Sequence, residues 1–279
     1  MAPVLPGLAA PAPRKLAVPA LHLQVLDLSH RGTELFFSHT SSPQAVLSES
    51  AQRVLHSLYP PSLEQVDASS MDDVAAHPPP HPPIRSITLH LRAMDGVAHT
   101  CSSDLDKDHK EIHLSTSYLA SVDSNSGSDS RRIKQEIEGV LTHELVHVFQ
   151  WDGEGTVPGG VIEGIADWVR AEHGLGPPHW QEGPSEQDKW DAGYQTTGFF
   201  LSWLSRHLEN PLLVPQLNLA MRSSTWSGGE HLTRLLGGQD VETLWETYKK
   251  TFRRKPDGDD EPPKPVPTHG AGSGYNVRY

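Results

Sequence analysis

The chain has 279 residues and a formal net charge of -12 at pH 7, and it contains no long run of Lys or Arg. This balance argues against nucleic acid and against an anionic membrane surface as partners. Cys101 is the only cysteine, so an internal disulfide and a zinc site built on cysteines are both excluded. No stretch approaches the about 18 apolar residues that a membrane-spanning helix needs.

Both ends of the chain are predicted to be disordered tails. Residues 1–19 contain five prolines among alanines, and residues 255–279 mix Pro, Gly and Asp without apolar periodicity. We therefore expect one folded domain over residues 20–254. The start of the chain lacks a basic segment followed by an unbroken apolar run, so no signal peptide is predicted and an intracellular, cytoplasmic location is favoured.

The hydrophobic pattern predicts an α+β fold in which a small N-terminal sheet precedes a mainly helical part. Alternating apolar residues predict strands over residues 21–28, 84–91 and 110–115. Helical spacing predicts helices over residues 43–58, 131–150, 161–171, 196–208, 211–221 and 241–252. Residues 94–108 are predicted to form a turn and a loop, and residues 121–130 a polar loop in which Asp129 or Ser130 caps the next helix.

The helix predicted over residues 131–150 contains the pattern His143-Glu144-x-x-His147. Residues four apart share one face of a helix, so the two imidazoles can point at a single ion. Hydrolytic zinc sites use three protein ligands and keep a fourth position for water, and Glu144 is placed to act on that water as a general base. The pattern predicts a Zn²⁺ site, although a His-rich chain can contain these five residues by chance.

The next predicted helix supplies two acidic residues, Glu163 and Asp167, which are four positions apart and share a face. Glu163 can complete a His, His, Glu zinc site, while Asp167 can orient a ligating histidine by accepting a hydrogen bond from its free ring nitrogen. A rival set uses Asp167 as the third ligand. A third histidine is not available, because Gln150 and Gly153 stand where the longer zinc-peptidase pattern has Gly and His.

A family resemblance covers about residues 20 to 252. Its most specific block is Gly159-Gly160-Val161-Ile162-Glu163-Gly164-Ile165-Ala166-Asp167, together with Gly139-Val140-Leu141-Thr142-His143-Glu144 and Trp190-Asp191-Ala192-Gly193-Tyr194. These motifs resemble the plant basic secretory protein family of metallopeptidases. The resemblance implies a zincin-like fold, His143 and His147 as zinc ligands, Glu144 as the general base, and Glu163 as the third ligand by similarity to gluzincins. This chain is acidic and shows no secretion signal, although the family allows secretion.

Tyr194 is the candidate for stabilising the oxyanion of a tetrahedral intermediate, and His113, on the candidate edge strand, is a weaker one. The leading hypothesis is a zinc metallopeptidase that acts on a peptide or protein substrate. An edge strand beside the metal would let a peptide add to the sheet as a further strand. The alternatives are a catalytically silent, zinc-stabilised binding or defence protein of the same fold, and an enzyme that hydrolyses a non-peptide amide.

Overall fold

The computed structural model describes residues 17–63, 81–127, 129–222, 225–226 and 230–253. The predicted tails lie outside these residues, apart from 17–19. One mixed sheet has the order β1-β2-β4-β3. Strands β1 and β4 both run parallel to β2, whereas β3 runs antiparallel to β4. The strands are β1 (Ala20–Val25), β2 (Ser86–Arg92), β3 (Ala98–Ser103) and β4 (Asp106–Ser115).

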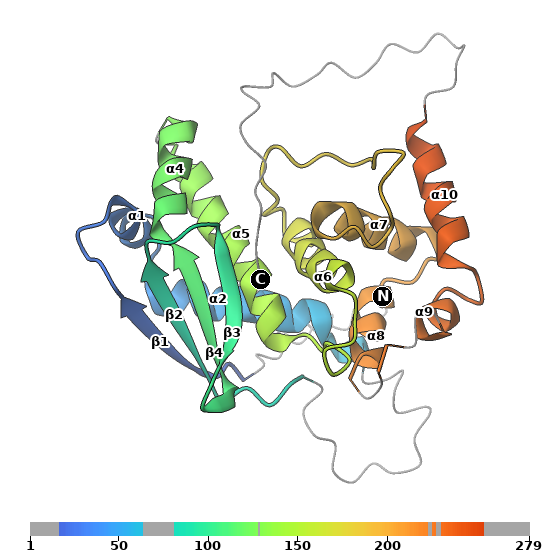
Figure 1. Ribbon diagram of the computed structural model, residues 1–279, viewed down its shortest axis with the longest axis horizontal. Coiled ribbons are helices and arrows are strands. Elements are labelled where there is room, and N and C mark those ends of the chain that lie inside the picture. Colours follow the sequence, from blue (N-terminus) through green and yellow to red (C-terminus); the bar gives the residue numbers. More distant parts are fainter. Residues whose placement is uncertain (1–16, 64–80, 128, 223–224, 227–229, 254–279) are drawn as a thin grey trace, which may run out of the picture.

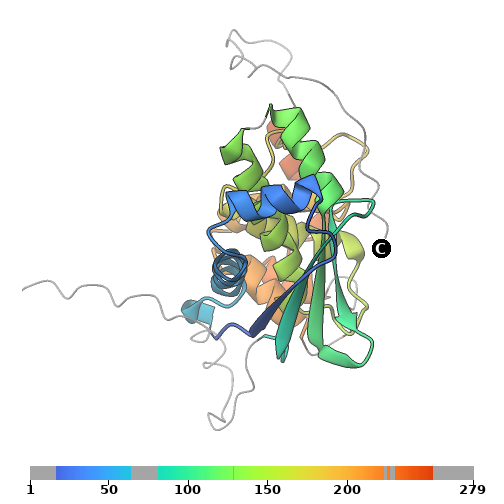
Figure 2. The ribbon, with the colours of Figure 1, turned by 90° about the vertical axis from the view of Figure 1, so that its left-hand side faces the viewer.

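Only one face of this sheet is covered by the described helices (Figure 1; Figure 2). On β2 the side chains of Ile87, Leu89 and Leu91 are fully buried, and the residues between them are only half-buried. This alternation places the apolar residues on the helix side and His90 on the opposite face. We call the helix side the inner face and the other side the outer face.

Four helices pack around the inner face: α1 (Arg31–His39), α2 (Pro43–Leu58), α4 (Thr116–Ser126) and α5 (Ser130–Phe149). Helix α2 begins as predicted, with Ser42 accepting a hydrogen bond from the Ala45 amide and Pro43 at the first position. Asp129 caps α5 through the amide of Arg131, which confirms one of the two predicted caps. Helix α1 was not predicted.

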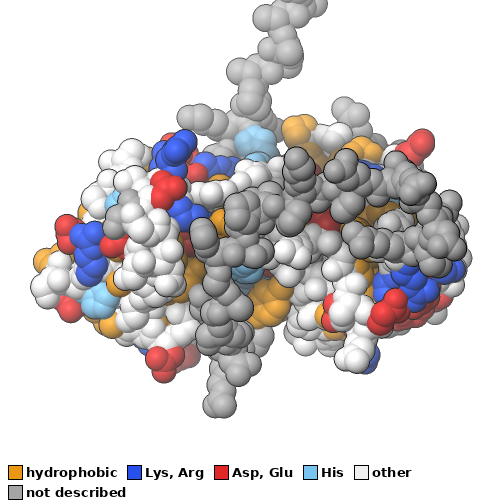
Figure 3. All heavy atoms as spheres, turned by 90° about the horizontal axis from the view of Figure 1, so that it is seen from above, with side chains coloured by type: hydrophobic (Ala, Val, Ile, Leu, Met, Phe, Trp, Pro, Cys, Tyr) orange, Lys and Arg blue, Asp and Glu red, His pale blue; other side chains and the backbone are white. Residues whose placement is uncertain are grey.

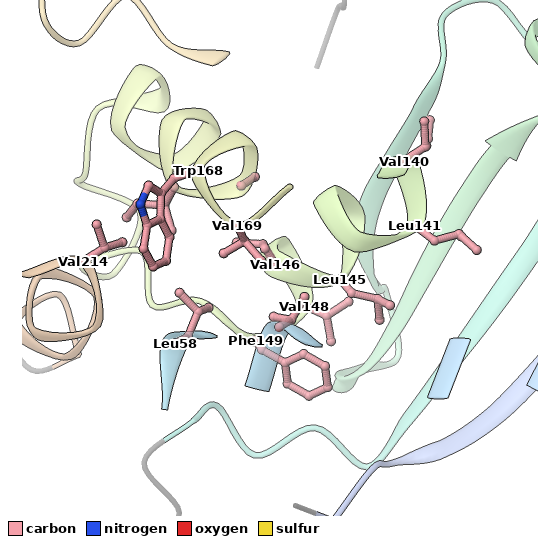
Figure 4. Packing of buried hydrophobic residues seen from close by; sticks show 14 of the residues in the cluster. Leu58, Val140, Leu141, Leu145, Val146, Val148, Phe149, Trp168, Val169 and Val214 are labelled. Atoms are coloured by element: carbon pink, nitrogen blue, oxygen red, sulfur yellow. The ribbon is translucent and has the colours of Figure 1, made fainter. Parts of the chain in front are cut away.

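The C-terminal part is helical, as predicted, and lies on the far side of α5 from the sheet (Figure 1). Its helices are α6 (Gly159–Glu172), α7 (Tyr194–His207), α8 (Leu213–Ala220), α9 (Glu230–Leu235) and α10 (Val241–Phe252). Helix α5 is therefore buried between two layers. In Figure 4, Leu141 and Leu145 point toward the sheet, whereas Val146 meets Val169 of α6. Buried side chains on both sides of α5 join the two layers into one hydrophobic core.

Two segments predicted as loops are regular structure. Residues 98–103, within the predicted loop 94–108, form strand β3 at the edge of the sheet. Their only buried apolar side chain is Ala98, so alternation could not reveal the strand, and pairing with β4 determines its conformation.

The predicted loop 121–130 is also partly wrong, because α4 extends to Ser126. Ser115 caps α4 by accepting from the Tyr118 amide, and Gly127 ends it in the left-handed conformation. Leu119 and Val122 anchor this polar helix in the core.

The surface carries charges of both signs. Seen from above, Lys and Arg side chains lie beside Asp and Glu side chains (Figure 3). Over the described part of the chain, every helix is too short or too polar to cross a lipid bilayer.

Candidate metal centre

Helices α5 and α6 bring the predicted metal ligands together. The turn between them contains Gly153 and Gly155 at positive φ, 61° and 76°, and lets the chain reverse direction. His143 and His147 project from the C-terminal half of α5, and Glu163 projects from the first half of α6. One ligand atom from each of these three residues lies within 4.8 Å of the other two.

The distances between the ligand atoms suit a tetrahedral ion. Nε2 of His143 lies 3.1 Å from Nε2 of His147 and 3.1 Å from Oε2 of Glu163. Nε2 of His147 lies 3.4 Å from Oε1 of Glu163. Zinc bound at about 2.0–2.2 Å in tetrahedral geometry separates its ligand atoms by about 3.3–3.5 Å. The three side chains therefore fit a zinc ion with little movement.

Two neighbours orient the imidazoles. Nδ1 of His143 donates to Oδ1 of Asp167 at 2.7 Å, so Asp167 contacts the ring nitrogen that points away from the ion site. On the other imidazole, the side-chain amide of Gln150 lies 3.3 Å from Nδ1 of His147. Such partners fix which ring nitrogen is available to a metal. The structure thus places Asp167 against the free ring nitrogen of a proposed ligand, as the sequence suggested. Gln150 was not predicted as an orienting residue.

Burial and the nearby carboxylates set the protonation of the site. Burial lowers the pKa of His143, but Asp167 and Glu163 outweigh it and raise that pKa to about 10. Burial and the charge on His143 lower the pKa of His147 to about 4. Glu163 places a negative charge beside both Nε2 atoms, and this charge favours a bound cation.

Glu144 lies beside the ligands and points into the same cleft. Its side chain is buried, and the hydroxyl of Thr100 on β3 donates to its Oε2 at 2.7 Å. The same hydroxyl lies 3.0 Å from the backbone oxygen of Glu144. Burial raises the pKa of Glu144, while His143 and Thr100 oppose the rise. A carboxylate held in this way is suited to accepting a proton. Thr100 was not predicted, because its strand shows no alternation.

Tyr194 lies across the cleft, at the first position of α7. Its ring is nearly parallel to that of His143, at 10° and 6.4 Å between centroids. The backbone of Tyr194 has a φ of 48°, which is unfavourable for a residue with a side chain, and such strain occurs often at functional sites.

Glycines let α6 and α7 approach closely. A Cβ on Gly164 would collide with Thr197, and a Cβ on Gly198 would lie 3.0 Å from the backbone nitrogen of Trp168.

The cleft has a volume of about 790 Å³ and lies between strand β3 and the start of α7. Ala98 and Thr100 line one side, and Trp180 and Tyr194 line another. His113 does not lie among its lining residues. It is placed on β4, inside the sheet rather than at its edge, and it stacks with His90 and His99 of the outer face. His113 is therefore not placed to stabilise the oxyanion in this cleft. The edge strand beside the cleft is β3 rather than β4.

The sequence pattern of the protein family described as "Peptidase of plants and bacteria" matches residues 18–248. The match includes the paired helices and the cleft, and it confirms the resemblance to the basic secretory protein family. The chain belongs to this peptidase family. No curated protein and no solved structure matches the chain.

Proposed function

We propose that this protein is a zinc-dependent peptidase with a zincin-like fold, in which His143, His147 and Glu163 hold the ion. The observation that carries the proposal is the convergence of these three ligands with the carboxylate of Glu144 in one cleft. Membership of a peptidase family supports it independently. A site that is purely structural usually closes all four ligand positions with protein side chains.

When bound, zinc would polarise the scissile carbonyl group and make a water molecule more acidic. Glu144 accepts a proton from the water that attacks the carbonyl carbon and passes it to the leaving amine as the C–N bond breaks. Thr100 holds the Glu144 carboxylate in position, and Asp167 holds the ring of His143. The hydroxyl of Tyr194 donates a hydrogen bond to the oxygen that becomes negatively charged during the reaction.

The edge strand gives the cleft a way to bind an extended peptide. Within the described chain, β3 pairs only with β4, so its other edge is open to a further strand. A peptide backbone that hydrogen-bonds to this edge would run past Thr100 and hence past Glu144. This placement supports a peptide or protein substrate over a small non-peptide amide, because a small amide has no use for a strand edge.

Replacing Glu144→Gln tests the proposed mechanism. The variant keeps the metal ligands but cannot accept the proton, so kcat for peptide cleavage should fall by about 10²–10⁴-fold while zinc content stays unchanged. Cleavage of a peptide library, followed by mass spectrometry with and without chelator, measures activity, and metal analysis measures zinc. The matched control is Glu138→Gln on the same helix, whose side chain pairs with Arg53 and Lys134.

Full activity in Glu144→Gln would contradict the mechanism. Stoichiometric zinc in the unaltered protein without cleavage of any peptide would instead favour the zinc-stabilised binding or defence protein. Chelator-sensitive hydrolysis limited to non-peptide amides would identify the third alternative.

A further inference from the structure

The outer face of the sheet carries a row of histidines that the peptidase site does not use. His90 of β2 pairs in register with His113 of β4, which in turn pairs with His99 of β3. Their rings stack face to face, with centroids 4.4 Å apart for His90 and His113 and 4.6 Å apart for His99 and His113. Three neighbouring strands therefore present imidazoles side by side on the face that the described helices leave uncovered (Figure 2).

Glu111 adds a carboxylate to this row. It precedes His113 by two residues, so both side chains lie on the same face of β4. Oε2 of Glu111 is 3.4 Å from Nε2 of His113 and 3.7 Å from Nε2 of His90. Tetrahedral zinc separates its ligand atoms by about 3.3–3.5 Å. Ligand atoms of these three residues all lie within 4.8 Å of one another. The rings of His90 and His113 are nearly parallel, at 11°, so one of them turns when both bind the same ion.

Two buried ring nitrogens in this row make no hydrogen bond to any described residue. Nε2 of His90 and Nδ1 of His113 are buried and accept or donate no hydrogen bond within the described chain. A buried polar atom needs a partner, and a metal ion held beside Glu111 can supply one for Nε2 of His90.

We propose that His90, Glu111 and His113 bind a second divalent transition-metal ion, of which Zn²⁺ is the type, on the outer face of the sheet. Two imidazoles and one carboxylate form a ligand set that zinc accepts. Arg92, also on β2, places a positive charge near the histidines, and the carboxylate of Glu111 offsets it. The ion ties the two central strands, β2 and β4, together.

The outer site is separate from the α5–α6 site, because successive residues of a strand point to opposite faces. Thr100 points inward and contacts Glu144, whereas its neighbours His99 and Cys101 point outward. His99 and Cys101 also form a possible ligand group with His113. We assign the ion to Glu111 instead, because its carboxylate oxygen lies 3.4 Å from Nε2 of His113 and 3.7 Å from Nε2 of His90, close to the separation that zinc needs.

The test uses the full chain, stripped with chelator and dialysed against buffered Zn²⁺, with metal content measured by mass spectrometry. The unaltered protein should bind two zinc ions per chain. His90→Gln and Glu111→Gln should each lower the affinity for one of the two ions by at least about tenfold and leave the affinity for the other unchanged. Circular dichroism checks that each variant is folded.

His109→Gln is the matched control. His109 lies on β4, and its ring nitrogens contact the hydroxyls of Ser86 at 2.5 Å and Thr88 at 3.2 Å, so it is not a ligand. This variant should still bind two ions. His147→Ala removes a ligand of the α5–α6 site and should keep the outer ion. Failure at one site is thereby distinguished from failure at the other.

Cobalt identifies the ligands of the outer ion. In the His147→Ala background, Co²⁺ bound by imidazole and carboxylate should show no thiolate-to-cobalt charge-transfer band. Such a band, lost on Cys101→Ser, would overturn the assigned ligands. Two results would overturn the outer site itself. One is a single zinc ion in the unaltered protein that only His147→Ala removes. The other is two bound ions whose affinities neither His90→Gln nor Glu111→Gln changes.

Discussion

At the scale of single residues, Thr100 connects the sheet to Glu144, the proposed general base. Its hydroxyl donates to Oε2 of Glu144 at 2.7 Å, although the two residues are 44 positions apart. Replacing Thr100→Val keeps the shape of the side chain and removes the donor. We expect kcat to fall by about 10-fold or more while zinc content stays constant, because the carboxylate loses its orientation. Steady-state cleavage of a fixed peptide measures the change.

The control for this prediction is Ser102→Ala. Ser102 lies two residues further along β3, where its hydroxyl accepts from Lys110 at 2.7 Å, and it makes no contact with Glu144. Equal losses of kcat in both variants would show that Thr100 acts through the strand as a whole rather than through Glu144.

A second prediction at this scale decides between the two acidic residues of α6. Glu163 approaches both Nε2 atoms, whereas Asp167 contacts only Nδ1 of His143. Glu163→Gln should therefore abolish stoichiometric zinc binding, and Asp167→Asn should weaken it by about 10–100-fold. Competition with a chromogenic chelator measures both affinities. The reverse order would make Asp167 the third ligand.

These residues also show how far sequence reasoning reaches. Helical spacing alone places His143 and His147 on one face of α5, but it left Glu163 and Asp167 both open as the third ligand, because it does not show how α6 packs against α5. Gln150, three positions after His147, follows the same spacing and could have been found. Thr100 could not, because its contact with Glu144 depends on how the sheet packs against α5.

At the scale of elements, the close approach of α6 and α7 depends on small residues. A Cβ on Gly164 would collide with Thr197, whose buried hydroxyl donates to Trp190 O and accepts from the Gly193 amide. Thr197 cannot move aside without losing these bonds. We expect Gly164→Ala to lower the free energy of unfolding by about 1–3 kcal/mol. Urea denaturation followed by circular dichroism measures it.

Gly159→Ala is the corresponding control on α6. A Cβ at Gly159 would meet nothing within 4 Å, so this change should alter stability by less than about 1 kcal/mol. Because Ala has a higher helix propensity than Gly, a similar loss of stability in both variants would mean that the contact with Thr197 does not determine the effect.

The elements themselves were predicted unevenly, for a physical reason. Helices with an apolar stripe, such as α2 and α5, show their period in the sequence. Strand β3 has the sequence Ala-His-Thr-Cys-Ser-Ser, which is polar on both faces, so only its pairing with β4 defines it. Helix α4 has just a few buried positions and ends among serines, and it therefore resembled a loop.

At the scale of the whole molecule, Glu136 joins three helices. Glu136 lies on α5, where the guanidinium of Arg132 is 2.6 Å from its carboxylate. The carboxylate also accepts a hydrogen bond from the hydroxyl of Tyr118 on α4 at 2.6 Å and pairs with Arg170 of α6 at 3.0 Å. Burial acts to raise the pKa of Glu136, but Arg170 and Arg132 outweigh it and hold the pKa below the ordinary value of 4.5. The ionised form is thus stabilised by folding.

The sign of the pH dependence follows from that lowered pKa. The stabilisation is complete above the unfolded pKa of Glu136 and is lost as pH falls through the folded one. Glu136→Gln should destabilise the protein by about 3–5 kcal/mol at neutral pH, since Arg170 loses its buried partner, and the difference from the unaltered protein should narrow in acid. Urea denaturation at a series of pH values measures it. If the difference in unfolding free energy between Glu136→Gln and the unaltered protein stays constant across pH, the lowered pKa of Glu136 is contradicted. Glu138→Gln is again the control.

The short turn between α5 and α6 has a consequence for the order of folding. All three proposed zinc ligands lie between His143 and Glu163, so the ion site needs only a local hairpin of two helices. Local contacts carry a small loop-closure cost and form early. Tyr194 belongs to α7, which packs against Gly164 of this hairpin. We therefore expect the hairpin to be able to hold the proposed ion before α7 has docked and the cleft is complete.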